Sequence, residues 1–208
     1  MKISIIGSGH VGGTLARLCV KAGHEVSLVN SRGSASLQPF VDELGPQLHP
    51  LNSIDEALAF SDLIILAVHW RSIDLLPNFN AHGKIIVDTT NPYKSDGTFY
   101  ELGNDIPSTK VQEHFTGGVI VKAFNTIWFK HLAENGNKDL PMAERRVIPV
   151  AGDDSGAKSR VSGLIGDFGF GPLDTGSLKI GTAWQNISGP LYNKELTVRE
   201  ATEIIRKL

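Results

Sequence analysis

The sequence predicts an α/β fold with a doubly wound, mostly parallel sheet and a small C-terminal helical extension. Three observations lead to this prediction. The apolar run 3–6 is followed by a glycine-rich turn and then by a helical pattern. Strand-like and helix-like segments alternate along the chain. The run 63–68 is apolar throughout, as expected of a parallel strand covered on both faces. Together these features favour a Rossmann-type domain.

Apolar periodicity and turn residues define the predicted elements. Val11, Leu15 and Leu18 share one face of a helix over 10–22, which Gly23 ends, and a strand over 25–29 completes a βαβ unit. Further helices are predicted over 34–44, 53–60, 107–115, 127–134 and 155–168. Further strands are predicted over 47–51, 63–68, 84–88, 119–124 and 147–152, with an extended segment over 169–173. Helical segments follow after 178, and Thr197 caps the last of them.

Composition limits the class of protein. A chain of 208 residues suits one domain, or one domain with a small appendage. Its net charge of −2 indicates neither a nucleic-acid partner nor an anionic membrane surface. The single cysteine, Cys19, fits a reducing compartment, and no apolar stretch approaches the ~20 residues needed to span a bilayer. No signal-peptide pattern precedes the first strand, so we predict a cytoplasmic protein.

The turn after the first strand has the spacing GxGxxG, and it indicates dinucleotide binding. Gly7 allows a tight turn, Gly9 lets a pyrophosphate approach the backbone, and Gly12 lets the helix pack closely on the strand. Unpaired N–H groups and the positive end of the helix dipole then face the phosphates. The intervening Ser8, His10 and Val11 belong to the same predicted cofactor site.

The end of the second strand indicates which nicotinamide cofactor binds. NAD-specific folds place Asp or Glu there, to bind the ribose 2′-OH, whereas this chain has Asn30, Ser31 and Arg32. Arginine meets a 2′-phosphate with paired donors and stacks on adenine, and serine adds a hydroxyl. We therefore predict NADP(H), bound by a Rossmann domain over 1–145. A smaller part over 146–208 is expected to pack on it, and the helices beyond Ser177 offer a surface for a homodimer.

Later strands also end in polar side chains. Ligands of open α/β sheets bind outside the carboxyl ends of the strands, which places Val68, His69 and Trp70 near the cofactor. His69 is a candidate proton donor, or else a residue that bonds locally at a helix start. The turn Asn91-Pro92 follows another strand. The sequence offers no metal motif such as CxxC or HExxH.

On these residues, the chain resembles the deazaflavin-dependent NADP oxidoreductase family, whose members exchange hydride between NADP(H) and a deazaflavin. It is also similar to the nucleotide domain of six-transmembrane ferric reductases, which pass electrons through a flavin, and more distantly to pyrroline-5-carboxylate reductases. The resemblance covers nearly the whole chain. It rests on the segments 7–12, 31–32, 88–92, 122–125, 151–154 and 173–178.

The resemblance implies roles for several residues. Residues 8–11 would hold the pyrophosphate, and Ser31 and Arg32 the 2′-phosphate. Val68, His69 and Trp70 would lie along the nicotinamide ribose, Asn91 and Pro92 would flank the ring, and Ala123 and Asn125 would face the ring or its partner. Deazaflavin-using members carry a histidine where Asn125 stands, so Asn125 is more similar to the ferric-reductase-like branch.

Three functions follow as alternatives. Hydride transfer to a flavin or deazaflavin, as second substrate, needs no strong acid or base. Reduction of a small carbonyl or imine needs a proton donor, for which Lys122 is the first candidate and His69 the second. The third alternative is a sensor that binds NADP(H) and catalyses nothing. An NADP-dependent oxidoreductase with a small-molecule hydride acceptor or donor is the prediction that we adopt.

Overall fold

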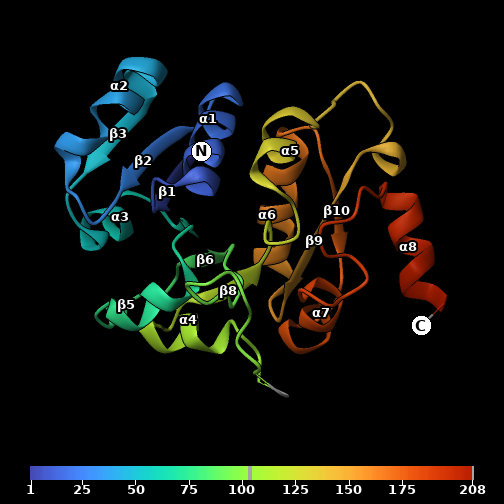
Figure 1. The fold of residues 1–208 in the computed structure, drawn as a ribbon. Coiled ribbons are helices and arrows are strands. Elements are labelled where there is room, and N and C mark those ends of the chain that lie inside the picture. The colour runs from blue at the N-terminus through green and yellow to red at the C-terminus, as the bar shows by residue number, and fades with distance from the viewer. Residues whose placement is uncertain (103–104, 208) are drawn as a thin grey trace. The chain divides into compact units, whose positions relative to one another are not determined.

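In the computed structural model, residues 1–102 and 105–207 are described, and they divide into two compact units. Unit 1 comprises Met1–Val119 and unit 2 comprises Ile120–Leu208. In Figure 1, unit 1 runs from blue to green and unit 2 from yellow to red. The predicted division after residue 145 stays a prediction.

Unit 1 contains a five-stranded parallel sheet in the order β6-β4-β1-β2-β3. The strands are β1 (Lys2–Ile6), β2 (Glu25–Val29), β3 (Leu48–Leu51), β4 (Leu63–Leu66) and β6 (Ile85–Asp88). All residues of β4 and β6 are buried, as the apolar run 63–68 predicted for the first of them. The strand order reverses beside β1, which is the switch point where the ligands of such sheets bind.

Helices cover both faces of this sheet. They are α1 (His10–Lys21), α2 (Gln38–Leu44), α3 (Ile54–Phe60) and α4 (Thr109–His114), with 3-10 turns η1 (Ser34–Leu37), η2 (Gly45–Gln47) and η3 (Trp70–Leu75). The chain returns from β3 to β4 across β1 and β2, so right-handed crossovers put α3 on the face opposite to α1 and α2 (Figure 1). Arg17 of α1 holds Glu43 of α2 through two bonds of 2.6 Å, which raises the pKa of Arg17 and lowers that of Glu43.

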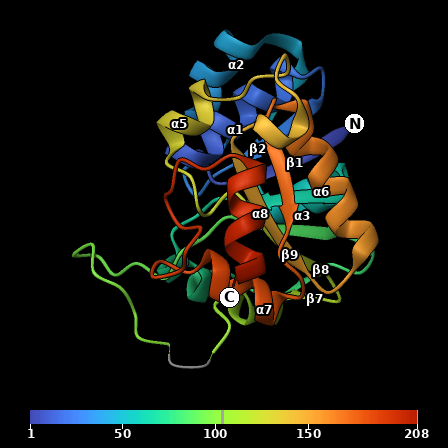
Figure 2. The same ribbon diagram turned by 90° about the vertical axis from the view of Figure 1, so that its right-hand side faces the viewer.

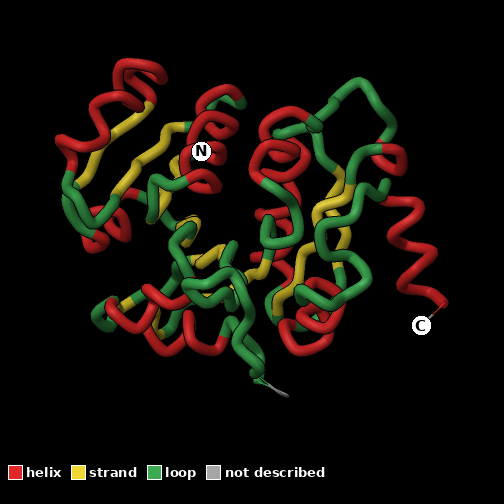
Figure 3. The backbone as a smooth tube through the Cα atoms, viewed as in Figure 1, coloured by secondary structure: helices red, strands yellow, loops and turns green. Residues whose placement is uncertain are grey.

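Several boundaries differ from the sequence prediction for local reasons. The segment 34–44 begins as the 3-10 turn η1 and becomes α2 only at Gln38, because Pro39 fits the first turn of a helix. α4 starts two residues after Pro107. The two-residue strands β5 (Phe79–Asn80) and β7 (Phe115–Thr116) pair with each other and were not predicted. After β6, residues 89–102 form a loop that Figure 3 shows in green.

Unit 2 is built on three strands. They are β8 (Val119–Lys122, which begins at the last residue of unit 1), β9 (Val147–Gly152) and β10 (Gly171–Asp174). β8 and β9 are antiparallel, whereas β9 and β10 are parallel. Their helices are α5 (Phe129–Glu134), α6 (Ser155–Asp167), α7 (Leu178–Gln185) and α8 (Val198–Lys207), with the turn η4 (Met142–Glu144).

α8 lies against β9 and β10 in Figure 2, and its buried Ala201 packs beside Val147 and Leu191. With parallel strands joined by helices in unit 1 and a helical C-terminal end in unit 2, the predicted α/β Rossmann-type fold class is confirmed.

Candidate functional site

The glycine turn after β1 is held by two glycines that the protein itself requires. Gly7 has φ of +108°, a conformation that favours glycine, and its N–H donates to the Val29 carbonyl over 2.8 Å. A Cβ at Gly7 would clash with the Ala67 carbonyl oxygen after β4, and a Cβ at Gly12 would clash with the Gly7 carbonyl oxygen. Any side chain at either position would therefore separate the loop from β4 or from α1.

The middle glycine of the turn is different. A Cβ at Gly9 would meet no protein atom within 4 Å, and Gly9 has φ of −75°, which any residue adopts. Nothing in unit 1 therefore requires a glycine at this position. Gly9 is also the N-cap of α1, where it supplies no side-chain cap, and the first turn of α1 contains no acidic residue. The positive end of the α1 dipole and its first N–H groups therefore remain available to an anion from outside the chain.

Asn30 joins the end of β2 to this turn. Its Nδ2 donates to Ser8 Oγ over 2.8 Å and lies 3.0 Å from Ser36 Oγ. Its Oδ1 accepts the Arg32 backbone N–H over 2.8 Å. Arg32 is exposed, and its Nη2 lies 3.4 Å from Ser8 Oγ, so the guanidinium reaches back over the glycine turn. Ser31 beside it is exposed as well.

This network brings together predicted residues from two segments about twenty positions apart. Ser8, predicted for the pyrophosphate, lies beside Asn30 and Arg32, predicted for the adenosine side of the cofactor. Ser36 was missed by the sequence prediction. Its hydroxyl also donates to the Gly33 carbonyl over 2.7 Å, and the ST-type spacing of three residues was the available signal.

Val68, His69 and Trp70 follow β4. Val68 lies next to Gly7, and His69 is exposed at the start of η3, where its carbonyl accepts the Ser72 N–H over 2.8 Å. The Trp70 ring stacks obliquely on Tyr100 at 5.1 Å, and its Nε1 lies 3.4 Å from the Pro107 carbonyl. Trp70 therefore ties the carboxyl end of β4 to the loop that follows β6.

The turn after β6 depends on a buried carboxylate. Asp88 is 0% exposed, and its Oδ1 accepts the Thr90 N–H over 2.8 Å and the Thr90 hydroxyl over 2.7 Å. Its Oδ2 accepts the Ser108 hydroxyl over 2.7 Å. These bonds hold the turn that presents Asn91 and the buried Pro92. Sequence reasoning noted the segment 88–92 but gave Asp88 and Ser108 no role.

In unit 2, the remaining predicted residues lie at the end of β8 and directly after it. Lys122 is 3% exposed, Ala123 is 0% exposed and Asn125 is 5% exposed. Asn125 Nδ2 donates to the Gln185 carbonyl at the end of α7 over 3.1 Å, which fixes the amide orientation. Phe124 between them has φ of +63°, an outlier for a bulky residue. Such backbone strain is found preferentially at functional sites.

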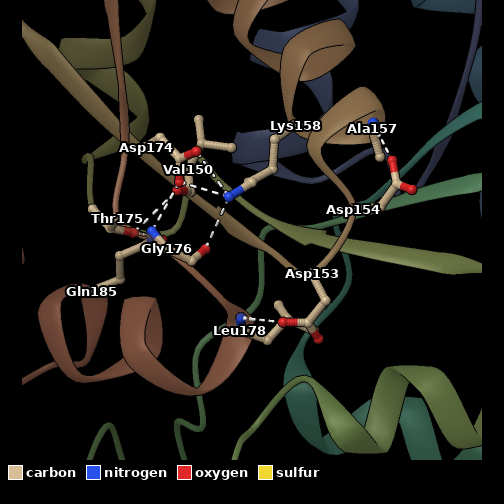
Figure 4. Close-up of polar contacts among 10 residues, drawn as sticks. All are labelled: Val150, Asp153, Asp154, Ala157, Lys158, Asp174, Thr175, Gly176, Leu178 and Gln185. Atoms are coloured by element: carbon tan, nitrogen blue, oxygen red, sulfur yellow. Dashed lines mark hydrogen bonds and ion pairs between the residues drawn. The ribbon is translucent and has the colours of Figure 1, made fainter.

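Two turns of unit 2 satisfy their own polar groups (Figure 4). Lys158 of α6 pairs with Asp174 at the end of β10, at 2.8 Å. Asp153 Oδ1 accepts the N–H of Leu178, the first residue of α7, over 3.1 Å. The Thr175 hydroxyl donates to the Val150 carbonyl and accepts the Gln185 amide, over 3.1 and 3.0 Å. The segments 151–154 and 173–178 therefore cap helices and join strands in this structure.

Residues 1–102 and 105–207 contain no group of three or more His, Cys, Asp or Glu side chains placed to hold a metal ion. Within the same residues, none of the helices combines the length and the apolar character that crossing a membrane requires.

Comparison with known proteins places this geometry among nucleotide-dependent reductases. Residues 2–92 match the family model described as "NADP oxidoreductase coenzyme F420-dependent". The metalloreductase STEAP3 of Rattus norvegicus is 32% identical over 180 residues, which cover 85% of this chain and 34% of that protein. The chain therefore spans about a third of the length of this curated relative.

Solved structures show the same fold. A hypothetical protein from Sinorhizobium meliloti superposes with a TM-score of 0.83, at 31% identity, with 95% of each chain covered. A protein from Arthrobacter sp. FB24, provisionally described as an F420-dependent NADP-reductase, superposes with a TM-score of 0.68, at 25% identity, with 86% of each chain covered.

Proposed function

We propose that this chain, whose residues 2–92 match the model of the coenzyme F420-dependent NADP oxidoreductases, transfers hydride between NADP(H) and a flavin, a deazaflavin or a related ring acceptor. The resemblance noted in the sequence and the oxidoreductase class are confirmed by this match and by the similar Arthrobacter structure, and both support NADP(H) as the cofactor. The acceptor is the proposed part.

The observation that carries the proposal is the uncapped start of α1 beside the Ser8–Asn30–Arg32 network. Gly9 leaves space for a pyrophosphate at the positive end of α1. The guanidinium of Arg32 has the fork geometry that suits a 2′-phosphate. The hydrogen bonds of Asn30 hold the Arg32 backbone beside Ser8. The end of β2 offers an amide and a guanidinium. A carboxylate at this position would repel the 2′-phosphate.

The other predicted residues would orient the reacting end of the cofactor. Bound NADPH supplies a hydride and, with a ring acceptor, needs no separate proton donor. We propose that Val68, His69 and Trp70 line the nicotinamide ribose and that the turn held by Asp88 presents Asn91 and Pro92 to the ring. Trp70, fixed by its contact with Tyr100, would help to exclude water. The placement of Ala123 and Asn125 toward the ring stays a prediction.

The character of the two candidate proton donors favours a ring acceptor over a carbonyl or imine. His69 is exposed and begins a 3-10 turn, and Lys122 is 3% exposed within a strand. Neither environment is distinctive of a general acid. Direct hydride transfer requires only that the two rings lie at the right distance and orientation and are shielded from water. A cytoplasmic location and a homodimer also stay predictions of the sequence.

The first experiment tests the cofactor site. Arg32→Ala removes the charge-assisted bonds to the 2′-phosphate, so the NADPH dissociation constant is expected to rise ~10- to 100-fold. The NADH dissociation constant should change less than about threefold, because NADH lacks that phosphate. Isothermal titration measures both constants, and Arg160→Ala, at an exposed arginine of α6, is the matched control. Equal losses for the two cofactors would remove Arg32 from the 2′-phosphate site.

The second experiment tests the acceptor. Anaerobic stopped-flow oxidation of NADPH is measured with flavin mononucleotide, with a deazaflavin and with a small cyclic imine. We expect turnover with a ring acceptor and, in Lys122→Met, a single-turnover rate within about tenfold of the native rate, because no proton donor is required. Lys122→Gln repeats the test with a polar side chain.

Two outcomes would contradict the acceptor proposal. A loss beyond ~100-fold in both folded Lys122 variants, with turnover of the imine, would indicate proton-coupled reduction. NADPH binding without turnover of any acceptor would favour the redox sensor.

A further inference from the structure

Arg146 of unit 2 is a buried cation directly before β9. Its backbone is fixed, since its carbonyl accepts the Gly171 N–H over 2.9 Å and the residue bridges to Thr197. Its side chain is 9% exposed, and burial lowers the pKa of the guanidinium from its ordinary value. Arginine nevertheless stays protonated in proteins, so this is a charge that the fold has withdrawn from water.

The guanidinium is paired only loosely. Within the described residues, an ion pair joins its Nη1 to Glu195 Oε1 at 3.5 Å, longer than the 2.7–2.9 Å typical of charge-assisted hydrogen bonds. Over the described ranges of the chain, neither Nη1 nor Nη2 makes a hydrogen bond, although both atoms are buried. A buried donor without an acceptor is costly, and a guanidinium fork is shaped for an oxyanion with two oxygens.

His131 of α5 faces the same carboxylate oxygen. Its buried Nδ1 lies 3.4 Å from Glu195 Oε1 and also makes no hydrogen bond within the described residues. The ring of Trp128 meets the His131 ring edge-on, with centroids 5.3 Å apart, and Trp128 is 47% exposed. A cationic fork and an imidazole therefore meet at one oxygen atom, and an exposed aromatic ring lies against the imidazole.

Glu195 itself can leave without disturbing the fold around it. Its side chain is 68% exposed. The backbone of its segment is held independently, because the Leu196 carbonyl accepts the Val147 N–H over 2.9 Å and the Val198 N–H donates to the Arg145 carbonyl over 3.1 Å. Rotation of the Glu195 side chain into water would expose Arg146 and His131 while α8 stays in place.

We propose that Arg146, His131 and Trp128 form a second ligand site, on unit 2, for a small molecule that carries a carboxylate or phosphate group next to an apolar ring. The fork and the imidazole bind the oxyanion, and Trp128 contacts the ring. The Glu195 carboxylate is an internal competitor that pairs with Arg146 and faces the His131 imidazole until the ligand displaces it. The proposed site uses none of the residues assigned to NADP(H).

The test uses the full chain saturated with NADP⁺, so that the phosphate-binding residues of unit 1 are occupied. Benzoate and phenyl phosphate are titrated as probes, with benzyl alcohol as the uncharged control. The readout is the indole N–H resonance of Trp128, assigned with Trp128→Phe. Glu195→Gln removes the competing carboxylate. If the Glu195–Arg146 pair forms ~90% of the time in the native protein, this variant should bind at least one probe about tenfold more tightly. Glu203→Gln, at an exposed glutamate of α8, is the matched control and should leave affinity unchanged.

Arg146→Met in the Glu195→Gln background should weaken binding at least tenfold and abolish the Trp128 shift. If that variant does not fold, Arg146→Lys keeps the charge without the fork and should give a smaller loss. Preference for phenyl phosphate or for benzoate identifies the oxyanion. Failure of both probes to bind folded Glu195→Gln, or equal binding with and without the Arg146 guanidinium, would overturn the proposal. Neither result depends on hydride transfer, so the proposed function is tested separately.

Discussion

The starts of α1 and α6 are built from similar parts but are completed in opposite ways. Each follows a strand through a short turn, with Gly7 and Gly9 in the turn before α1 and Gly152 at the end of β9 before α6. At α6, the N-cap Asp154 accepts the Ala157 N–H over 2.6 Å, and Asp153 beside it accepts the Leu178 N–H. At α1, the N-cap is Gly9, which has no side chain to offer. A helix start capped by the chain's own carboxylates is structural, whereas an uncapped one remains available to a phosphate.

The same contrast holds among the glycines. Gly7 and Gly12 are required because a Cβ would strike backbone atoms of unit 1 itself, whereas Gly9 faces open space. In α6, a Cβ at Gly163 or Gly166 would also meet nothing within 4 Å, but both lie inside the helix, where glycine costs stability and serves no close approach. A glycine whose Cβ would meet no protein atom therefore indicates a ligand site only when it also stands at an uncapped helix start.

The largest effect is expected for Gly12→Ala. The added methyl group would force the Gly7 carbonyl away from α1 and should lower the free energy of unfolding by about 3 kcal/mol. Gly163→Ala, the matched change in α6, should raise it by about 0.5–1 kcal/mol. Urea unfolding followed by circular dichroism measures both. Similar unfolding midpoints for the two variants would contradict the packing role assigned to Gly12.

A smaller effect, on binding alone, is expected for Gly9→Ala. Because the new methyl group contacts no protein atom, the free energy of unfolding should stay within about 0.5 kcal/mol of the native value. The methyl group would obstruct the approach of the pyrophosphate, so the NADPH dissociation constant should rise about tenfold. Calorimetric titration and urea unfolding are run on the same preparation. Unchanged NADPH affinity would mean that the phosphates bind elsewhere.

The smallest effect is expected for Asp154→Ala in unit 2. Loss of this cap should cost about 1 kcal/mol of unfolding free energy, and Asp154→Asn, which keeps a capping oxygen, should cost less. NADPH affinity should not change in either variant. A weakened NADPH affinity at native-like stability would show that the start of α6 is not purely structural.

The local parts of the molecule could be predicted from the sequence because their signals lie within a few residues. The apolar runs predicted β1, β4 and β9, and the glycine spacing predicted the turn after β1. Two-residue strands such as β5 and β7 carry too few side chains for any periodicity. The start of α5 was placed two residues early, since Trp128 has an extended backbone and serves as the N-cap.

The candidate site was predicted residue by residue but not as a network. Asn30 and Ser8 are 22 positions apart, and Asp88 and Ser108 are 20 apart, so nothing local links them. A hydrogen bond between distant segments depends on strand register and on where each loop returns, and the sequence pattern encodes neither. Arg146 is the clearest case, since its neighbours His131 and Glu195 come from two other segments.

The sequence by itself determined the unit of strand, glycine turn and helix. It also determined the absence of a carboxylate at the end of β2, on which the NADP(H) prediction rests. Both features depend only on residue type and spacing. The tertiary structure decided which glycine of the turn is free of protein contacts, which helix start stays uncapped and which buried charges are left loosely paired. The physical reason is that steric clash, capping and desolvation depend on atoms that folding brings together from distant parts of the chain.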